Sequence, residues 1–187
     1  FGGEESYGYL GADFLRDKDG NGAVVMFAEV AAYAKSLGIT SVELLDQLYA
    51  QHGVYLEGQH AETLSGADGA TMIQSLAQSY IDNPPSEIDG ASVDRVRDFA
   101  NHNYADEEGD AIPKEKMVFV DLADGRAFAV RPSGTEPKIK YYIYFRPGSA
   151  PASPLSADEL AAAKLSAKES FDSLREAIVA DMRSRLG

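Results

Sequence analysis

The chain has 187 residues, a net charge of −13 at pH 7 and a sequence pI near 4.6. Hydrophobic residues make up 44%, which provides for a buried core and argues against wholesale disorder. The absence of cysteine excludes disulfides and thiolate metal sites and fits an intracellular protein. Because an acidic field repels nucleic acid and anionic membranes, we expect neither as a partner, and a site for an anionic ligand must be a local basic island.

Residues 1–53 are predicted to be mostly helical after a glycine-rich opening loop. Apolar side chains at helical spacing predict one helix over about 23–37. Thr40 and Glu43 fit a capping box for the next helix, whose expected buried stripe consists of Leu44, Leu45 and Leu48. Since these helices are too few to form a core alone, we expect the segment to be the end of a domain. The loop-like start without an initiator methionine favours a fragment.

From residue 54 the pattern changes to strands mixed with helices. Alternating and apolar runs predict strands over 54–64, 117–122, 126–130 and 138–145, and helices over 68–81 and from 156 onward. Residues 86–100 fit either a strand with a turn or a short helix, and 101–116 indicate a solvated acidic loop. The side chains expected to face inward from the first of these helices are Met72, Ile73, Leu76 and Tyr80.

The fold class is therefore predicted as α+β. A helical remnant of an α/β domain over 1–53 is followed by a small domain over 54–187, in which a mostly antiparallel sheet packs against helices. The clearest strand alternates, with Ile139, Tyr141 and Ile143 on one side and lysines and tyrosines on the other. Helices should accordingly cover one face of the sheet.

The segment 131–138, Arg-Pro-Ser-Gly-Thr-Glu-Pro-Lys, joins two predicted strands and concentrates groups that bind phosphate. Phosphate is well matched by a planar arginine fork, hydroxyl donors and backbone N–H groups that turn inward at glycine. Lys138 and Lys140 add positive charge on one face of the next strand, so this segment is the basic island that the acidic chain requires. Composition alone favours a simpler interpretation, a hairpin turn with a surface arginine.

Other patterns suggest sites that we do not favour. Residues 17–22 resemble the opening of an EF-hand loop, but its twelfth position is Ala28, so a polar turn that caps the next helix is the better interpretation. The three histidines are scattered, and no metal site is expected. The acidic residues 106–110 indicate a solvated loop. The aromatic run 141–145 alternates and lies in an acidic chain, which argues against nucleic-acid binding.

Two motifs resemble the C-terminal part of the α-D-phosphohexomutases, the phosphoglucomutase/phosphomannomutase family. Residues 131–138 look like the phosphate-binding loop of the last domain of that family. Residues 3–8, Gly-Glu-Glu-Ser-Tyr-Gly, resemble the sugar-binding loop of its third domain. The motifs occur in the right order with the right number of elements between them, so the resemblance covers essentially the whole chain.

The resemblance implies a role for each matching residue. Glu4 and Ser6 would form hydrogen bonds with hydroxyl groups of the hexose. The phosphate that is not being transferred would be bound by Arg131, Ser133, the backbone of Gly134, Thr135 and, as a weaker candidate, Lys140. Hexose phosphate is the expected ligand. Glu4 and Ser6 would contact ring hydroxyls that glucose and mannose share, so the two are not distinguished, and pentose phosphate stays open as a side substrate.

In the family, a phosphoserine donates its phosphoryl group to the sugar, a glucose 1,6-bisphosphate-type intermediate reorients, and Mg²⁺ on an aspartate-rich loop stabilises the transferred charge. The chain contains no similar phosphoserine or aspartate-rich loop. The resemblance therefore implies a catalytically inactive fragment that depends on missing N-terminal domains, in a cytoplasmic enzyme. Two other classes stay open: a non-catalytic module that binds anions or sugar phosphates, and a protein-interaction domain.

Overall fold

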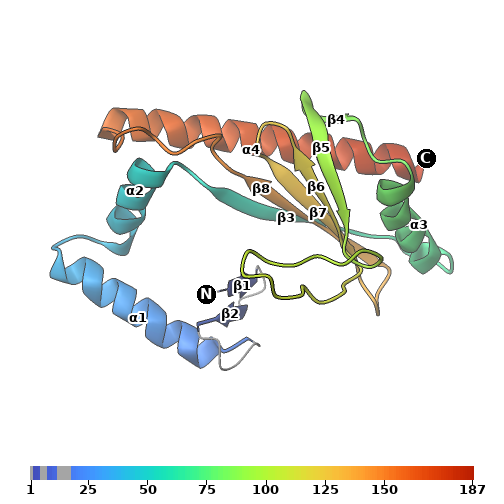
Figure 1. Cartoon of the computed structure of the whole chain (residues 1–187), viewed down its shortest axis with the longest axis horizontal. Coiled ribbons are helices and arrows are strands. Elements are labelled where there is room, and N and C mark those ends of the chain that lie inside the picture. Colours follow the sequence, from blue (N-terminus) through green and yellow to red (C-terminus); the bar gives the residue numbers. More distant parts are fainter. Residues whose placement is uncertain (1, 5–7, 12–17) are drawn as a thin grey trace. The chain divides into compact units, whose positions relative to one another are not determined.

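The computed structural model describes residues 2–4, 8–11 and 18–187 (Figure 1). The chain divides into two compact units, which are Phe1–Gly53 with Ala150–Leu160, and Val54–Ser149 with Ala161–Gly187. The segment 150–160, which the sequence placed with the second unit, groups with the first because it returns to the second helix there. The backbone N–H of Leu155 donates to the carbonyl of Ala50 at 2.9 Å.

The first unit contains a short hairpin and two helices. Strands β1 (Gly2–Glu4) and β2 (Gly8–Leu10) pair antiparallel, where the sequence had predicted a loop. Strands of three residues are too short for an alternating pattern to appear in the sequence. Helices α1 (Gly20–Ser36) and α2 (Ser41–His52) confirm the two predicted helices.

Both helices of this unit start at a side chain that caps the backbone. The Asp19 carboxylate accepts bonds of 3.0 Å from the N–H groups of Asn21 and Gly22, so this turn caps α1 as predicted. The Thr40 hydroxyl accepts from the Glu43 N–H at 3.1 Å. The Glu43 carboxylate in turn accepts from the Thr40 N–H at 2.7 Å, which confirms the capping box of α2.

The apolar side chains of α1 and α2 are largely exposed. The prediction of a buried leucine stripe on α2 is therefore wrong. Leu45 and Leu48 are 43% and 47% exposed, and α2 buries no residue. A two-stranded hairpin offers too little surface to cover two amphipathic helices. No single described helix is long and apolar enough to cross a membrane, while the pair α1 and α2, bent by 84° at their junction, passes the same test by length and composition only.

The second unit is built on a six-stranded antiparallel sheet in the order β3-β8-β7-β6-β5-β4. The strands are β3 (Leu56–Thr63), β4 (Glu87–Ile88), β5 (Ala91–Asp98), β6 (Val118–Leu122), β7 (Ala127–Pro132) and β8 (Lys138–Phe145). Residues 86–100 thus form two strands, which a turn with positive φ at Asp89 (50°) and Gly90 (75°) joins. Figure 1 shows the sheet with helices α3 (Gly69–Asp82) and α4 (Ala157–Leu186).

One face of the sheet carries the core of this unit, as the alternation predicted. The largest buried side chains on it include Val120, Phe128, Val130, Ile139, Tyr141 and Ile143 from the strands, with Ile73, Leu76 and Tyr80 from α3 and Leu174, Ile178 and Met182 from α4. Met72, which was expected to face inward, is 42% exposed. The buried stripe of α3 follows Ile73 at spacings of three and four, and Met72 lies beside that stripe.

The opposite face of the sheet is aromatic and polar. Phe119 on β6 and Tyr144 on β8 stack with ring centroids 5.5 Å apart. They meet across the intervening strand β7, whose Ala129 is small and fully buried. Arg97 lies 4.4 Å from the centroid of the Phe119 ring and forms two hydrogen bonds of 3.0 Å with Asp121. Arg97 is therefore held by neighbouring side chains of the sheet.

A buried arginine joins the β4–β5 turn to α4. Arg126 is 8% exposed and contacts the carboxylates of Asp89 and Asp124, the latter at 2.7 Å. The Ser173 hydroxyl of α4 donates to the other Asp89 oxygen at 2.6 Å. Burial alone would raise the pKa of Asp89, but the hydrogen bonds from Ser173 and Arg126 outweigh burial and hold that pKa below its ordinary value.

Replacement of a buried leucine on α4 should lower the free energy of unfolding far more than replacement of an exposed leucine on the same helix. Leu174 is 0% exposed and Leu165 is 60% exposed, both on α4. We expect Leu174→Ala to lower the free energy of unfolding by about 2–5 kcal/mol and Leu165→Ala by less than about 0.5 kcal/mol. Urea unfolding followed by circular dichroism measures both, and equal losses would contradict the placement of α4 on the sheet.

The Asp89 network should make stability depend on pH in the acid range. A carboxyl whose pKa is lower in the folded chain stabilises the fold at pH values above the unfolded pKa of about 3.9, and this contribution is lost as the pH falls below that value. Asp89→Asn should therefore reduce stability at pH 7 and flatten its decline between about pH 5 and pH 2. Asp94→Asn, at an exposed position of β5, is the control, and an identical effect of both substitutions would refute the assignment.

Candidate phosphate-binding site

The loop between β7 and β8 is closed by its own backbone and organised by a serine hydroxyl. The Ser133 N–H donates to the carbonyl of Lys138 at 2.8 Å. The Ser133 hydroxyl accepts from the N–H groups of Thr135 at 3.4 Å and Glu136 at 3.2 Å. Around Gly134 the space is open, since an added Cβ would meet no atom within 4 Å. The tip thus presents the Ser133 and Thr135 side chains beside the open space at Gly134, while the N–H groups of Ser133, Thr135 and Glu136 are already bonded within the loop.

The C-terminal end of this loop is anchored to two other elements. The Leu64 N–H, just after β3, donates to the carbonyl of Pro137 at 2.9 Å. At the start of α3, a Cβ on Gly69 would lie 2.0 Å from the Leu64 carbonyl oxygen and 3.4 Å from Pro137. Only glycine fits this close approach, which packs the start of α3 against the loop. The tip is therefore exposed while its base is fixed.

Arg131 precedes the loop on β7 and lies opposite Lys140 on β8. The alternation places both side chains on the face of the sheet that the helices leave uncovered. The Arg131 Nε donates to a Glu115 carboxylate oxygen at 3.3 Å, and both side chains are 47% exposed. A hydrogen bond with Tyr142 and then the charge of Glu115 hold the pKa of Arg131 above its ordinary value. The Lys140 ammonium lies 5.8 Å from the centroid of the Tyr142 ring.

The structure brings five of the seven predicted binding residues to one end of the β7–β8 pair. These are Arg131, Ser133, Gly134, Thr135 and Lys140. Glu4 ends β1 in the first unit, opposite Gly8, and Ser6 lies outside the described residues. The binding roles of all seven stay predictions.

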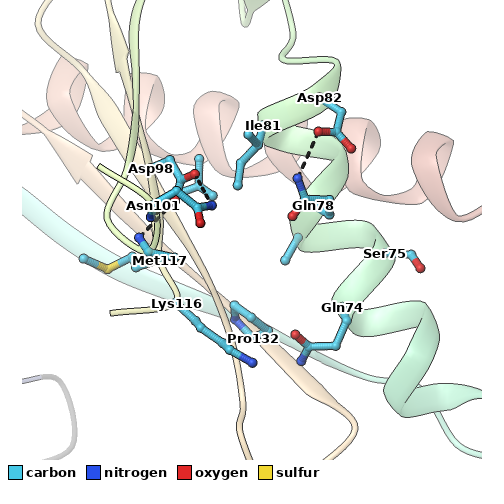
Figure 2. A pocket seen from close by; sticks show the side chains of 13 residues that line it. Gln74, Ser75, Gln78, Ile81, Asp82, Asp98, Asn101, Lys116, Met117 and Pro132 are labelled. Carbon is cyan, nitrogen blue, oxygen red and sulfur yellow. Dashed lines mark hydrogen bonds between the residues drawn. The ribbon is translucent and has the colours of Figure 1, made fainter. Parts of the chain in front are cut away.

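A cleft of about 620 Å³ adjoins the loop on the helix-covered side of the sheet. Its polar lining includes Gln74 and Gln78 of α3 together with Asn101 and Lys116. Figure 2 shows Gln74 and Lys116 pointing toward Pro132, the residue before Ser133. The sequence did not indicate this cleft because its walls come from segments far apart in the chain, with no shared period or motif.

A buried aspartate shapes one wall of the cleft. Asp98 is 6% exposed and accepts hydrogen bonds from the N–H groups of Ala100 at 2.9 Å and Asn101 at 3.2 Å, and from the Asn101 amide at 2.7 Å. Burial alone would raise the pKa of Asp98, but these hydrogen bonds outweigh it and keep the pKa low. Its role is therefore to hold the turn after β5.

The described residues offer one cluster of carboxylates for a cation, Asp106, Glu108 and Asp110, whose oxygens lie within 4.8 Å of one another. All three are exposed, and one Asp106 oxygen already accepts from the N–H groups of Glu108 at 3.0 Å and Asp110 at 2.9 Å. Mg²⁺ requires near-octahedral oxygen geometry and is usually held also by phosphate oxygens of a ligand, which this solvated turn does not provide. The cluster is therefore most simply an exposed acidic turn. Asp17 of the EF-hand-like segment lies outside the described residues.

Two family models match the chain. Residues 1–52 match the phosphoglucomutase/phosphomannomutase alpha/beta/alpha domain III, and residues 85–146 match the phosphoglucomutase/phosphomannomutase C-terminal domain. Together they cover more than half of the chain, and the second includes the whole loop 131–138. The chain belongs to the phosphoglucomutase/phosphomannomutase family. It corresponds to the third and C-terminal domains, which confirms the resemblance seen in the two motifs.

Curated relatives agree with this assignment. Phosphoglucomutases from two strains of Staphylococcus aureus are each 36% identical over 148 residues, which is 76% of this chain and 27% of the relative. The chain thus spans about a quarter of the length of the relatives it matches. The open form of parafusin (phosphoglucomutase) from Paramecium aligns with a TM-score of 0.51 and 21% identity over 91% of this chain and 30% of that chain, which shows a shared fold.

The match to domain III also accounts for the exposed apolar sides of α1 and α2. That family domain has alpha/beta/alpha layers, whereas the described part of the first unit contains two helices and a two-stranded hairpin. Helices in such layered domains place their apolar side on a sheet. The leucine stripe of α2 therefore has the pattern of a sheet-covering helix, although no sheet covers it among the described residues.

Proposed function

We propose that this chain is part of a phosphohexomutase that interconverts hexose 1-phosphate and hexose 6-phosphate through a phosphoserine and a bisphosphorylated hexose. One observation carries the proposal: a half-exposed arginine and a lysine stand beside an open hydroxyl-bearing loop in a chain of net charge −13. The names of the curated relatives favour glucose phosphates as substrates. We further propose a cytoplasmic location.

In this proposal the loop binds the phosphate that does not react. Arg131 offers a planar set of N–H donors that matches two phosphate oxygens, and the hydroxyls of Ser133 and Thr135 and the backbone of Gly134 supply further donors. The favourable binding energy at this remote phosphate orients the reacting end of the sugar. Glu4 and Ser6 are proposed to bind the ring hydroxyls, which would set the position of the sugar between the two ends.

The reacting groups are proposed to lie in the remainder of the full-length enzyme. The chain contains no segment like the phosphoserine loop or the aspartate-rich loop of the family. A Mg²⁺ ion bound to the latter would stabilise the negative charge of the transferring phosphoryl group. The residues of this chain therefore hold and orient the ligand, and we propose that the chain alone does not transfer phosphate.

Loss of Arg131 should impair the mutase reaction of the full-length enzyme. We expect Arg131→Ala to lower kcat/KM for glucose 1-phosphate roughly 10- to 100-fold, the range for loss of charge-assisted hydrogen bonds. The assay follows formation of glucose 6-phosphate. Arg146→Ala removes an exposed arginine just beyond β8 and should leave the rate unchanged.

The same assay separates three parts of the proposal. Absence of mutase activity in the unsubstituted full-length protein would overturn the proposed function. Equal rates for Arg131→Ala and the unsubstituted enzyme would overturn the role of the loop while leaving the reaction intact. The 187-residue chain alone should form no glucose 6-phosphate, and turnover by it would show that the reacting groups lie within it.

A further inference from the structure

A carboxylate outside the two motifs 3–8 and 131–138 contacts the guanidinium of the proposed phosphate site. Glu115 lies outside the loop 131–138, yet its carboxylate oxygen is 3.3 Å from the Arg131 Nε. The backbone of Glu115 is fixed on both sides. Its N–H donates to the carbonyl of Phe99 at 3.3 Å, and its carbonyl accepts from the Met117 N–H at 2.7 Å. The carboxylate is therefore tethered beside Arg131.

Glu115 engages only part of the guanidinium. Arg131 donates to the Glu115 carboxylate through Nε at 3.3 Å. An arginine has five N–H donors, so donors remain for a ligand. Any phosphate that reaches them comes close to a carboxylate of like charge. Repulsion between these two negative charges sets phosphate and Glu115 in competition for Arg131.

We propose that Glu115 is the exchange partner of Arg131: its carboxylate neutralises the guanidinium when the site is empty, yields it to the ligand phosphate, and takes it back when the phosphate leaves. This inference rests on the proposed function, in which Arg131 binds the phosphate that is not transferred. Glu115 acts through Arg131 and is thus a positioning residue.

Two physical properties of the pair suit it to exchange. Both side chains are half exposed, so the ion pair is weak enough for a phosphate dianion to displace the carboxylate into water. The tether keeps the carboxylate at high local concentration, so Arg131 is not left unpaired as the phosphate departs. Phosphate is therefore bound more weakly and released faster from Arg131. Fast release suits a bisphosphorylated sugar that must dissociate from this loop before it reorients.

The change in phosphate affinity after loss of Glu115 distinguishes an exchange partner from a residue that only holds Arg131 in place. If Glu115 only held Arg131 in place, its loss would weaken phosphate binding. If it competes, its loss must strengthen binding. We expect Glu115→Gln to lower the Kd of the chain for inorganic phosphate roughly three- to tenfold, from loss of one like charge at close range in a high dielectric. Glu115→Ala should act in the same direction.

The matched control is Glu107→Gln, which removes the same charge from an exposed position of the same acidic loop. Phosphate affinity is measured by isothermal titration of the full chain and should not change in this control. In the full-length enzyme, Glu115→Gln should lower KM for glucose 1-phosphate and also lower kcat, because release of the phosphate becomes slower. A role confined to support would raise KM.

Outcomes that defeat this inference differ from those that defeat the proposed function. Weaker or unchanged phosphate binding in both Glu115 variants, with binding still abolished by Arg131→Ala, would overturn the exchange role alone. Phosphate binding that survives Arg131→Ala would remove the proposed phosphate site itself. Equal tightening in Glu115→Gln and Glu107→Gln would attribute the change to net charge and also overturn the exchange role.

Discussion

The antiparallel register of β7 and β8 is the constraint on which the site depends. It places Arg131 opposite Lys140 and Pro132 opposite Ile139. Because side chains alternate between faces, a slip of one residue would move Arg131 into the core and Ile139 out of it. The fully buried Ile139, Tyr141 and Ile143 resist that slip through the apolar area they would expose. The hydrophobic core thus orients a charged site on the opposite face of the sheet.

The turn that follows β5 also positions residues of the candidate site, because it fixes the segment just before β6. Asp98 caps this turn, and Lys114 reaches back to it by donating to the Asn101 carbonyl at 3.1 Å. These bonds fix the end of the acidic loop 101–116 just before β6. Two neighbouring residues then diverge: Glu115 contacts Arg131, and Lys116 lines the cleft. One buried carboxylate therefore supports side chains on both sides of the sheet.

Local patterns in the sequence predicted the elements that depend on local physics. Besides the box at Thr40, Ser156 and Glu159 exchange hydrogen bonds as a capping box at the start of α4, with the Ser156 N–H donating at 2.8 Å. The alternation of β8 was also predictable, since it depends on a repeated spacing. The family resemblance came from two short motifs rather than from spacing.

What the sequence missed depends on contacts between distant segments. The pair of Glu115 and Arg131 joins residues 16 apart with no periodic relation, and the cleft draws on several separate segments. The leucines of α2 have the correct helical spacing, but burial requires a partner surface that spacing does not describe. Met72 was misplaced for a related reason: a shift of one position along the helix decides whether a side chain faces the sheet, and the spacing did not settle that position.

Every role proposed for this chain depends on phosphate binding at the tip of the β7–β8 loop through Arg131. The decisive experiment is titration of inorganic phosphate into the isotopically labelled chain, followed by the amide resonances of Ser133, Gly134 and Thr135. We expect saturable shifts confined to these amides and their neighbours at millimolar phosphate, and their disappearance in Arg131→Ala. Shifts that persist in that variant, or that gather elsewhere in the chain, would contradict it.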